Sequence, residues 1–239
     1  MVDRTLHVPG LHNARDLGGL PLVGGGTTPF GVFIRSETPD LVTAEGWERL
    51  RAHGIRTVVD LRRPDERPGS GASRPSWATV VAVDLHDPGF VERHGQDGLD
   101  GAAVHYLDRL AEAPGAVVEA LRAIGDAGPG GVLIHCVGGR DRTGLLAALL
   151  LVVAGVDHEA IVGDYLETVA NAPRLAAAQG VPNWEPGVDR LLDRLGTSTE
   201  RSFREFLAAV DVEPLLRAVG SARARRLRTW RGALTDEGR

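Results

Sequence analysis

Short apolar runs alternate with amphipathic stretches along the first two thirds of the chain. Three of these runs are rich in β-branched residues and end at turn residues, at 57–59, 79–85 and 132–134. Runs of this length and composition predict buried strands. Between the first two lies a loop-type sequence at 64–76, in which proline, glycine and serine are frequent and apolar residues are few.

Apolar residues at helical spacing mark three further segments. The first, 43–50, has Thr43 as its predicted N-cap and ends before Gly54, just ahead of a strand. The second, 113–127, carries its apolar residues on one helix face. The third, 144–154, is too apolar to be a helix that is solvated all round, so we expect it in the core of the protein.

From residue 157 onward the pattern is helical, with loop-type interruptions at 180–183 and 196–198. Strands that alternate with helices, followed by a helical tail, predict an α/β fold with a parallel or mixed central sheet flanked by helices. We expect one domain over residues 1–239. Within it, 157–220 is expected to form a helical appendage, either a subdomain or a lid.

Composition narrows the class of protein. The chain has 239 residues, of which 43% are hydrophobic and 25% charged, as in a soluble globular protein. Its formal charge of −5 argues against broad binding to nucleic acid and leaves room for a local anion pocket. The longest apolar run, 145–154, is too short for stable membrane insertion, and the N-terminus lacks the apolar core of a signal peptide.

These features predict a cytoplasmic protein, with export by a route that needs no signal peptide as the alternative. The basic stretch at 223–231 is interpreted as a solvated last helix, and contact with anionic lipid is its alternative function. Nothing in the sequence indicates an oligomeric state.

The chain holds a single cysteine, and all 27 of its basic residues are arginines. One cysteine excludes an internal disulfide framework and a cysteine-rich zinc site. We expect neither a metal nor another cofactor. The surroundings of Cys136 therefore decide what its thiol does.

Cys136 lies in the segment His-Cys-Val-Gly-Gly-Arg-Asp-Arg-Thr-Gly, between a predicted strand and an apolar helix. A loop in this position can turn successive backbone N–H groups toward an anion, and the following helix adds its positive N-terminal end. Glycines permit the positive φ angles that such wrapping requires. The same field would stabilise a thiolate, so Cys136 is a candidate nucleophile in a phosphate-binding loop.

The loop residues have distinct expected roles. Arg142 can grip two phosphate oxygens with its planar guanidinium. Thr143 can donate its hydroxyl to the sulfur, and His135 is expected to support the loop through bonds to nearby backbone. The residues expected to surround the phosphate are Val137, Gly138, Gly139, Arg140, Asp141 and Arg142.

The pattern His-Cys-x-x-Gly-x-Asp-Arg-Thr-Gly resembles the signature of cysteine-dependent tyrosine and dual-specificity phosphatases, in the form that bacterial tyrosine phosphatases carry. Four other segments are similar to that family, at 13–19, 34–36, 54–62 and 161–166. The resemblance implies a tyrosine phosphatase-like central sheet, a cysteinyl-phosphate intermediate and, as substrate, a phosphorylated protein or a phosphoinositide. The family commonly has a lysine where this chain has Arg140.

The general acid is the least constrained role. The resemblance places it at Asp141, where a neighbouring phosphate would help the carboxyl to keep its proton. Asp60 is the second candidate, because its strand should neighbour the strand before Cys136, and it could instead orient Arg142 or Arg140. Asp87 is a third candidate, on a loop.

Several polar residues outside the loop are also of interest. Arg35 and Arg62 either line the mouth of the pocket or form ordinary ion pairs at strand ends. Asn13, Arg15 and Asp16 are expected to brace the core through local hydrogen bonds.

The sequence thus predicts a phosphomonoester hydrolase, with two rivals. One is a module that binds a phosphorylated ligand without turning it over. The other is a sulfurtransferase of the rhodanese type, which also holds its reactive sulfur in an amide-lined loop. Arg142 and Thr143, together with the leading His135, favour phosphate.

Overall fold

A five-stranded mixed sheet forms the centre of the protein. The computed structural model describes residues 2–67, 74–99 and 101–234. The strands lie in the order β1-β2-β5-β3-β4, and their bounds are Arg15–Asp16 (β1), Phe33–Ser36 (β2), Ile55–Asp60 (β3), Thr79–Ala82 (β4) and Gly131–His135 (β5). β1 is antiparallel to β2, and the other neighbouring strands are parallel. The α/β prediction with a mixed sheet is confirmed.

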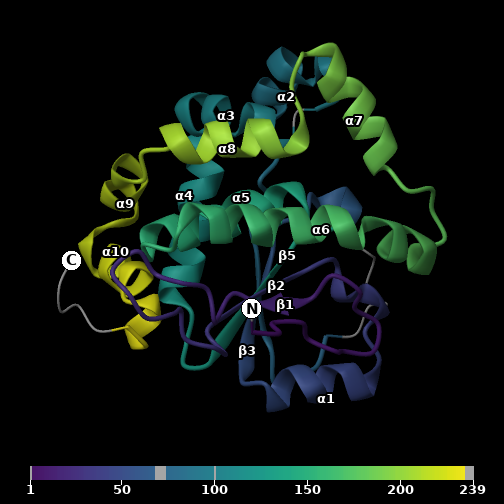
Figure 1. Ribbon diagram of the computed structural model, residues 1–239. Helices are drawn as coiled ribbons and strands as arrows, with labels where there is room; N and C mark the ends of the chain where they lie inside the picture. Colours follow the sequence, from purple (N-terminus) through teal and green to yellow (C-terminus); the bar gives the residue numbers. More distant parts are fainter. Residues whose placement is uncertain (1, 68–73, 100, 235–239) are drawn as a thin grey trace.

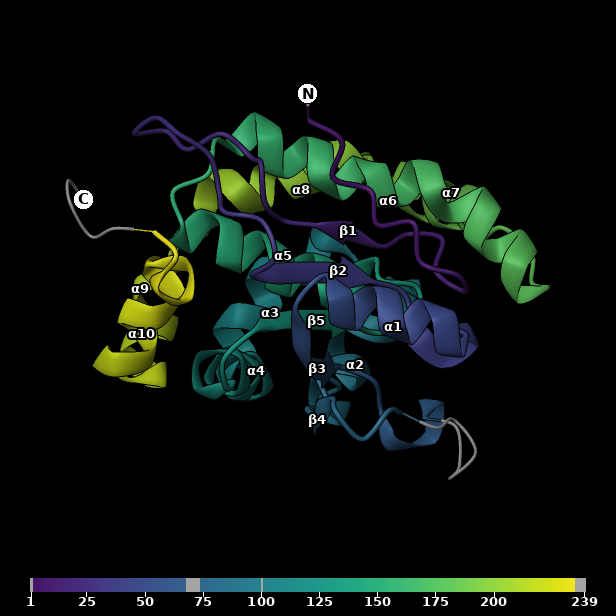
Figure 2. The ribbon, with the colours of Figure 1, turned by 90° about the horizontal axis from the view of Figure 1, so that it is seen from below.

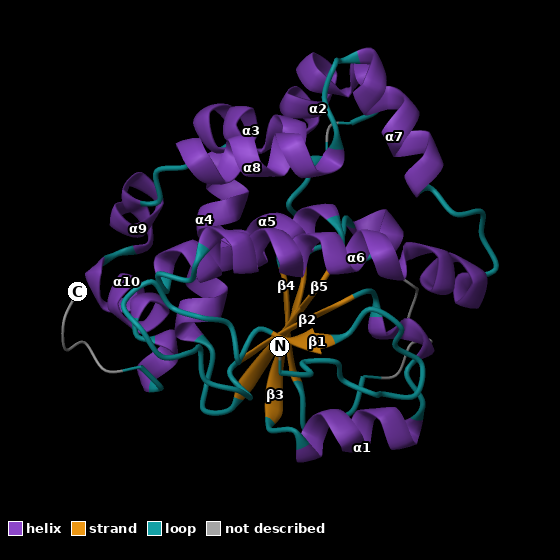
Figure 3. Cartoon of the chain, in the orientation of Figure 1, coloured by secondary structure: helices purple, strands orange, loops and turns teal. Residues whose placement is uncertain are grey.

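The described ranges contain ten α-helices. Their bounds are Ala44–Ala52 (α1), Pro88–His94 (α2), Tyr106–Glu112 (α3), Pro114–Asp126 (α4), Asp141–Val153 (α5), His158–Gln179 (α6), Glu185–Arg194 (α7), Thr199–Ala209 (α8), Glu213–Val219 (α9) and Ser221–Arg228 (α10). Figure 1 and Figure 2 show them on both sides of the sheet, with α8 and α7 beyond α5 and α6. Figure 3 shows α1 on the opposite side of the strands from α5 and α6.

Alternation along the strands explains why both faces of the sheet are covered. Ile34 and Leu133 pack in the cluster that contains Trp47 of α1, whereas their chain neighbours Phe33 and Ile134 pack in the larger cluster formed with α4 and α5. Successive side chains of a strand point to opposite faces, so a strand covered on both sides must be apolar at nearly every position.

Most of the predicted elements are present. The strands predicted at 57–59 and 132–134 are β3 and β5, and the one predicted over 79–85 ends earlier, at Ala82. α1 has the predicted cap, because the Thr43 hydroxyl accepts a hydrogen bond from the Gly46 amide at 3.1 Å. α4, α5 and the helices after residue 157 are confirmed as well. The apolar pattern did not predict β1, β2, α2 or α3.

Part of the loop predicted over 64–76 lies outside the described residues, at 68–73. Its first residues, Pro64–Glu66, form a single turn of 3-10 helix.

Helices from the predicted appendage at 157–220 take part in the main core. Tyr165 of α6 stacks on Phe203 of α8 with ring centroids 4.0 Å apart, and both side chains are 1% exposed. α7 differs, because its Leu192 packs in a separate small cluster with Leu99 and Ala102. None of the helices in the described ranges is long and apolar enough to cross a membrane.

A buried ionic cluster joins α6 to the edge of the sheet. The Asp164 carboxylate accepts hydrogen bonds from Arg4 (2.8 Å), Arg15 (2.9 Å) and Arg35 (2.6 Å). Burial alone would raise the pKa of Asp164, but the charges of these arginines outweigh burial and hold it far below its usual range. Arg35 therefore forms an ion pair, the second of the two predicted possibilities. Arg15 makes the expected local hydrogen bond, to Asn13 at 2.8 Å, and its ion pair with the distant Asp164 was not predicted.

Candidate active site

Cys136 stands directly after β5, the middle strand of the sheet, and five residues before the first residue of α5. The loop between them is shaped by Gly139, which has a φ of +69°. A Cβ at this position would lie 2.4 Å from the carbonyl oxygen of Ser36, so only glycine fits. Beneath the loop, Arg35 donates a hydrogen bond to the Gly139 carbonyl at 2.7 Å, which links the loop to the Asp164 cluster.

The thiol lies at a cavity of about 210 Å³. Loop residues 136–138 and 140–142 line this cavity, together with Gln179 at the end of α6 and Trp184 just before α7. Cys136 itself is only 2% exposed. The structure thus brings five of the six predicted phosphate-binding residues to the cavity, while Gly139 turns beneath the loop against Ser36. Sequence reasoning missed Gln179 and Trp184.

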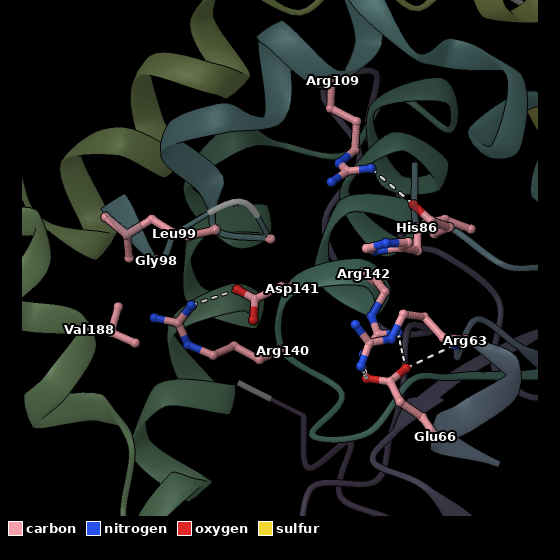
Figure 4. A pocket seen from close by; sticks show the side chains of 13 residues that line it. Arg63, Glu66, His86, Gly98, Leu99, Arg109, Arg140, Asp141, Arg142 and Val188 are labelled. Atoms are coloured by element: carbon pink, nitrogen blue, oxygen red, sulfur yellow. Dashed lines mark hydrogen bonds and ion pairs between the residues drawn. The ribbon is translucent and has the colours of Figure 1, made fainter. Parts of the chain in front are cut away.

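Arg142 reaches the cavity from the first turn of α5. Its guanidinium is held by the carboxylate of Glu66, with Nη2 donating to Oε1 at 2.9 Å and Nη1 donating to Oε2 (Figure 4). Burial would lower the pKa of Arg142, but the Glu66 hydrogen bonds and the nearby Cys136 raise it above its usual range. Glu66 is a further site residue that the sequence did not reveal.

Arg140 is turned toward α7. Its Nε and Nη2 atoms donate to the two carboxylate oxygens of Glu185 at 2.7 and 3.0 Å, and its Nη1 donates to Asp141 at 2.7 Å. Burial would lower the pKa of Arg140, but the negative groups around it raise it well above its usual range. The guanidinium expected to contact phosphate is thus engaged by two carboxylates, and it joins the loop to α7.

Asp141 is the first residue of α5, and its side chain is 35% exposed. It lines the cavity at the thiol and also a second cavity of about 270 Å³, to which Arg63, His86 and Arg109 contribute (Figure 4). The second cavity is larger but does not include Cys136 in its lining. Among the three aspartates considered, Asp141 is the one that lines the cavity at the thiol.

Asp60 has the predicted neighbour but a different partner. It is paired in register with His135, as expected for adjacent strand ends, and its carboxylate accepts from Arg62 at 2.9 and 2.8 Å. Burial would raise the pKa of Asp60, but the hydrogen bonds from Arg62 outweigh burial and lower it. The expectation that Asp60 orients Arg142 or Arg140 is corrected, because Glu66 and Glu185 hold those two guanidinium groups.

Arg62 is ion-paired at a strand end, the second of its two predicted possibilities. Asp87 caps α2 by accepting a hydrogen bond from the Phe90 amide at 2.8 Å, which explains its place in the sequence by local structure.

His135 and Thr143 flank the loop and are fully buried. The Nδ1 atom of His135 lies 3.0 Å from the Cys136 carbonyl oxygen, so this side chain supports the loop as expected. Burial lowers the pKa of His135 to about 4, which keeps its ring neutral near pH 7. The Thr143 hydroxyl has no hydrogen-bond partner in the described part of the chain, so the expected bond to sulfur is not formed here.

Comparison with known proteins agrees with this site. The sequence profile of the tyrosine phosphatase family matches residues 6–219. The chain is 34% identical over 165 residues to a protein of Cupriavidus necator named as a tyrosine-protein phosphatase, covering 66% of this chain and 60% of that protein. It is 32% identical over 200 residues to the triple specificity protein phosphatase PtpB of Mycobacterium tuberculosis, covering 71% of each.

A crystal structure of TpbA from P. aeruginosa matches with 21% identity and a TM-score of 0.36, over 79% of this chain and 86% of that one. The chain spans less than two thirds of the length of the Cupriavidus relative. The matched range begins at residue 6, ends with α9 and includes the whole loop around Cys136. This chain belongs to the tyrosine phosphatase family.

Proposed function

We propose that the chain is a phosphomonoester hydrolase that acts through a cysteinyl-phosphate intermediate. The observation that carries this proposal is the position of Cys136 at a cavity formed by the loop between β5 and α5, with Arg142 at the same cavity. Family membership supports it. The same loop at a helix N-terminus suits a tetrahedral dianion, because its backbone N–H groups and the helix dipole favour negative charge.

In the first step the Cys136 thiolate attacks phosphorus, the bond from phosphorus to the leaving oxygen breaks, and that oxygen receives a proton from Asp141. In the second step water attacks phosphorus, the phosphorus–sulfur bond breaks, and Asp141 takes a proton from the water. Arg142 and the loop amides stabilise the charge on the equatorial oxygens in both steps. Neither step requires a metal.

The proposed substrates are phosphorylated proteins and phosphoinositides. The triple specificity stated in the name of the mycobacterial relative supports a broad range. α7 is the part of 157–220 that we propose as a lid, because it packs in its own small cluster and contacts the loop through Glu185. The cytoplasmic location stays a prediction.

Turnover of p-nitrophenyl phosphate in EDTA tests the reaction, with the native chain compared with Cys136→Ser. We expect the native chain to turn over and the variant to show no turnover above background, because the hydroxyl of serine is a far weaker nucleophile than a thiolate. Equal rates from both, or no native turnover across a range of pH, would refute the proposal.

The same proteins test both rivals. A non-catalytic binding module would bind vanadate without any native turnover. A rhodanese-type sulfurtransferase would turn over thiosulfate faster than phosphomonoesters.

A further inference from the structure

Trp184 is the one aromatic side chain lining the cavity at the thiol within the described residues. It lies in the connection between α6 and α7, 48 positions after Cys136 in the sequence. Its benzo edge sits over the loop, since a Cβ built on Gly138 would lie 3.6 Å from Cζ2 and 3.9 Å from Cη2 of the indole. These are ordinary van der Waals distances, so a side chain at Gly138 would touch the indole, and the ring lies next to the loop.

The indole is held in this place by a chain of bonds that begins in the loop. Its Nε1–H donates to Oε1 of Glu185 at 2.9 Å. The same oxygen accepts from Nε of Arg140 at 2.7 Å, and Glu185 and Arg140 are 5% and 4% exposed. A buried bidentate pair fixes direction as well as distance. The orientation of Trp184 is therefore set by the phosphate-binding loop that it covers.

The cavity has an apolar part that a phosphate group does not use. Val137 is 37% exposed at the loop, and both Val137 and Trp184 line the cavity. A phosphate dianion needs N–H donors and cations, which the loop backbone and Arg142 supply in the same lining. The apolar part must therefore meet the carbon skeleton of the substrate.

We propose that Trp184 is a specificity-determining residue, which packs against the aromatic ring of an aryl phosphomonoester, and that Glu185 is its positioning residue. This inference rests on the proposed hydrolase function. Two aromatic rings attract each other beyond their buried area in offset-stacked or edge-to-face geometry. The alkyl chain of a phosphoserine lacks a ring and cannot form this contact.

The test uses one peptide sequence carrying either phosphotyrosine or phosphoserine, and measures kcat/KM for both with each protein. For Trp184→Ala we expect the ratio of phosphotyrosine to phosphoserine kcat/KM to fall roughly two- to tenfold, the size of one aromatic contact. Trp184→Phe keeps an aromatic ring but lacks the Nε1–H that Glu185 holds, so its ratio should lie between those of the native chain and Trp184→Ala. Val181→Ala, in the same connection and at an exposed side chain, is the matched control and should leave the ratio unchanged.

Glu185→Ala, which removes the acceptor of the indole N–H, should lower the same ratio, and adding it to Trp184→Ala should lower it no further, because a positioning residue acts only through its target. Inhibition by vanadate reports whether the loop still binds an anion, and we expect it to be unchanged in Trp184→Ala. An unchanged ratio in Trp184→Ala, or an equal loss for both peptides, would overturn the inference. Failure of the underlying function would be seen separately, as turnover retained by Cys136→Ser.

Discussion

Replacing Asp164 by alanine removes the only carboxylate that Arg4, Arg15 and Arg35 all contact in the described structure. Asp164 and Arg35 are each about 1–2% exposed, and burial lowers the pKa of Arg15 to about 10 even with Asp164 beside it. The variant would leave buried guanidinium groups without their main counter-charge. Removing one partner of a buried ion pair costs about 3–5 kcal/mol.

That loss is a large part of the ~5–15 kcal/mol by which a typical domain is stable. We therefore expect Asp164→Ala to unfold at a much lower urea concentration than the native chain. Asp164→Asn keeps a hydrogen-bond acceptor but loses the charge, so its urea midpoint should lie between those of the native chain and Asp164→Ala. Because Arg35 also holds the Gly139 carbonyl, the folded fraction of Asp164→Ala should show a reduced kcat for p-nitrophenyl phosphate.

The control is Glu159→Ala on the same helix, whose pair with Arg204 is exposed. Exposed ion pairs contribute little to the free energy of unfolding, so the urea midpoint of Glu159→Ala should stay close to that of the native chain. An Asp164→Ala midpoint as close to native as that of Glu159→Ala would refute the reasoning.

The pH dependence gives a second check on Asp164. Its pKa in the folded state lies below the ordinary value of 3.8, so its stabilisation is complete above that value and is lost as the pH falls below it. The decline in stability below pH 4 should therefore be shallower in Asp164→Asn. An equally steep decline in both proteins would contradict the assigned pKa.

Three further predictions concern the loop. Gly139→Ala should lower the melting temperature and abolish turnover, because of the positive φ and the clash with Ser36; near-native activity would contradict the fit. Glu66→Gln should lower kcat/KM about tenfold or more by misplacing Arg142. The melting temperature should change little, because the ion pair between Glu66 and Arg142 is partly exposed. An unchanged kcat/KM would show that Glu66 does not orient Arg142. His135 has a pKa of about 4 in the folded protein against an ordinary 6.5, so the free energy of unfolding, measured with urea, should fall as the pH drops from 6.5 to 4. His135→Asn should lack this decline. An identical decline in both proteins would show that His135 is not buried.

The sequence was sufficient for elements whose burial comes from their own apolar residues. β3 and β5 each contain a short buried apolar run, at 58–59 and 132–134, that can be recognised locally. β2 carries only two apolar residues before Arg35 and Ser36. Its polar half is buried because Asp164 neutralises Arg35, and that partner lies more than 120 positions away along the chain.

The same distinction separates the site residues that were predicted from those that were missed. The loop around Cys136 is continuous in sequence, so its glycines, arginines and thiol could be interpreted together. Glu66 and Trp184 reach the site from separate connections, and neither lies in a local pattern that indicates a function. Asp60 was placed beside the correct strand, but strand register does not determine which neighbouring arginine a carboxylate contacts.

The contact between Phe33 and Trp230 determines how late in synthesis this part of the core can be completed. Trp230 is fully buried, packs edge-on against Phe33 of β2 at 4.6 Å, and donates a hydrogen bond to the Pro29 carbonyl at 3.1 Å. A ribosome synthesises β2 early and Trp230 nearly two hundred residues later. Because domains fold as units during synthesis, the contacts that Trp230 makes with Phe33 and Pro29 cannot form until translation has passed residue 230.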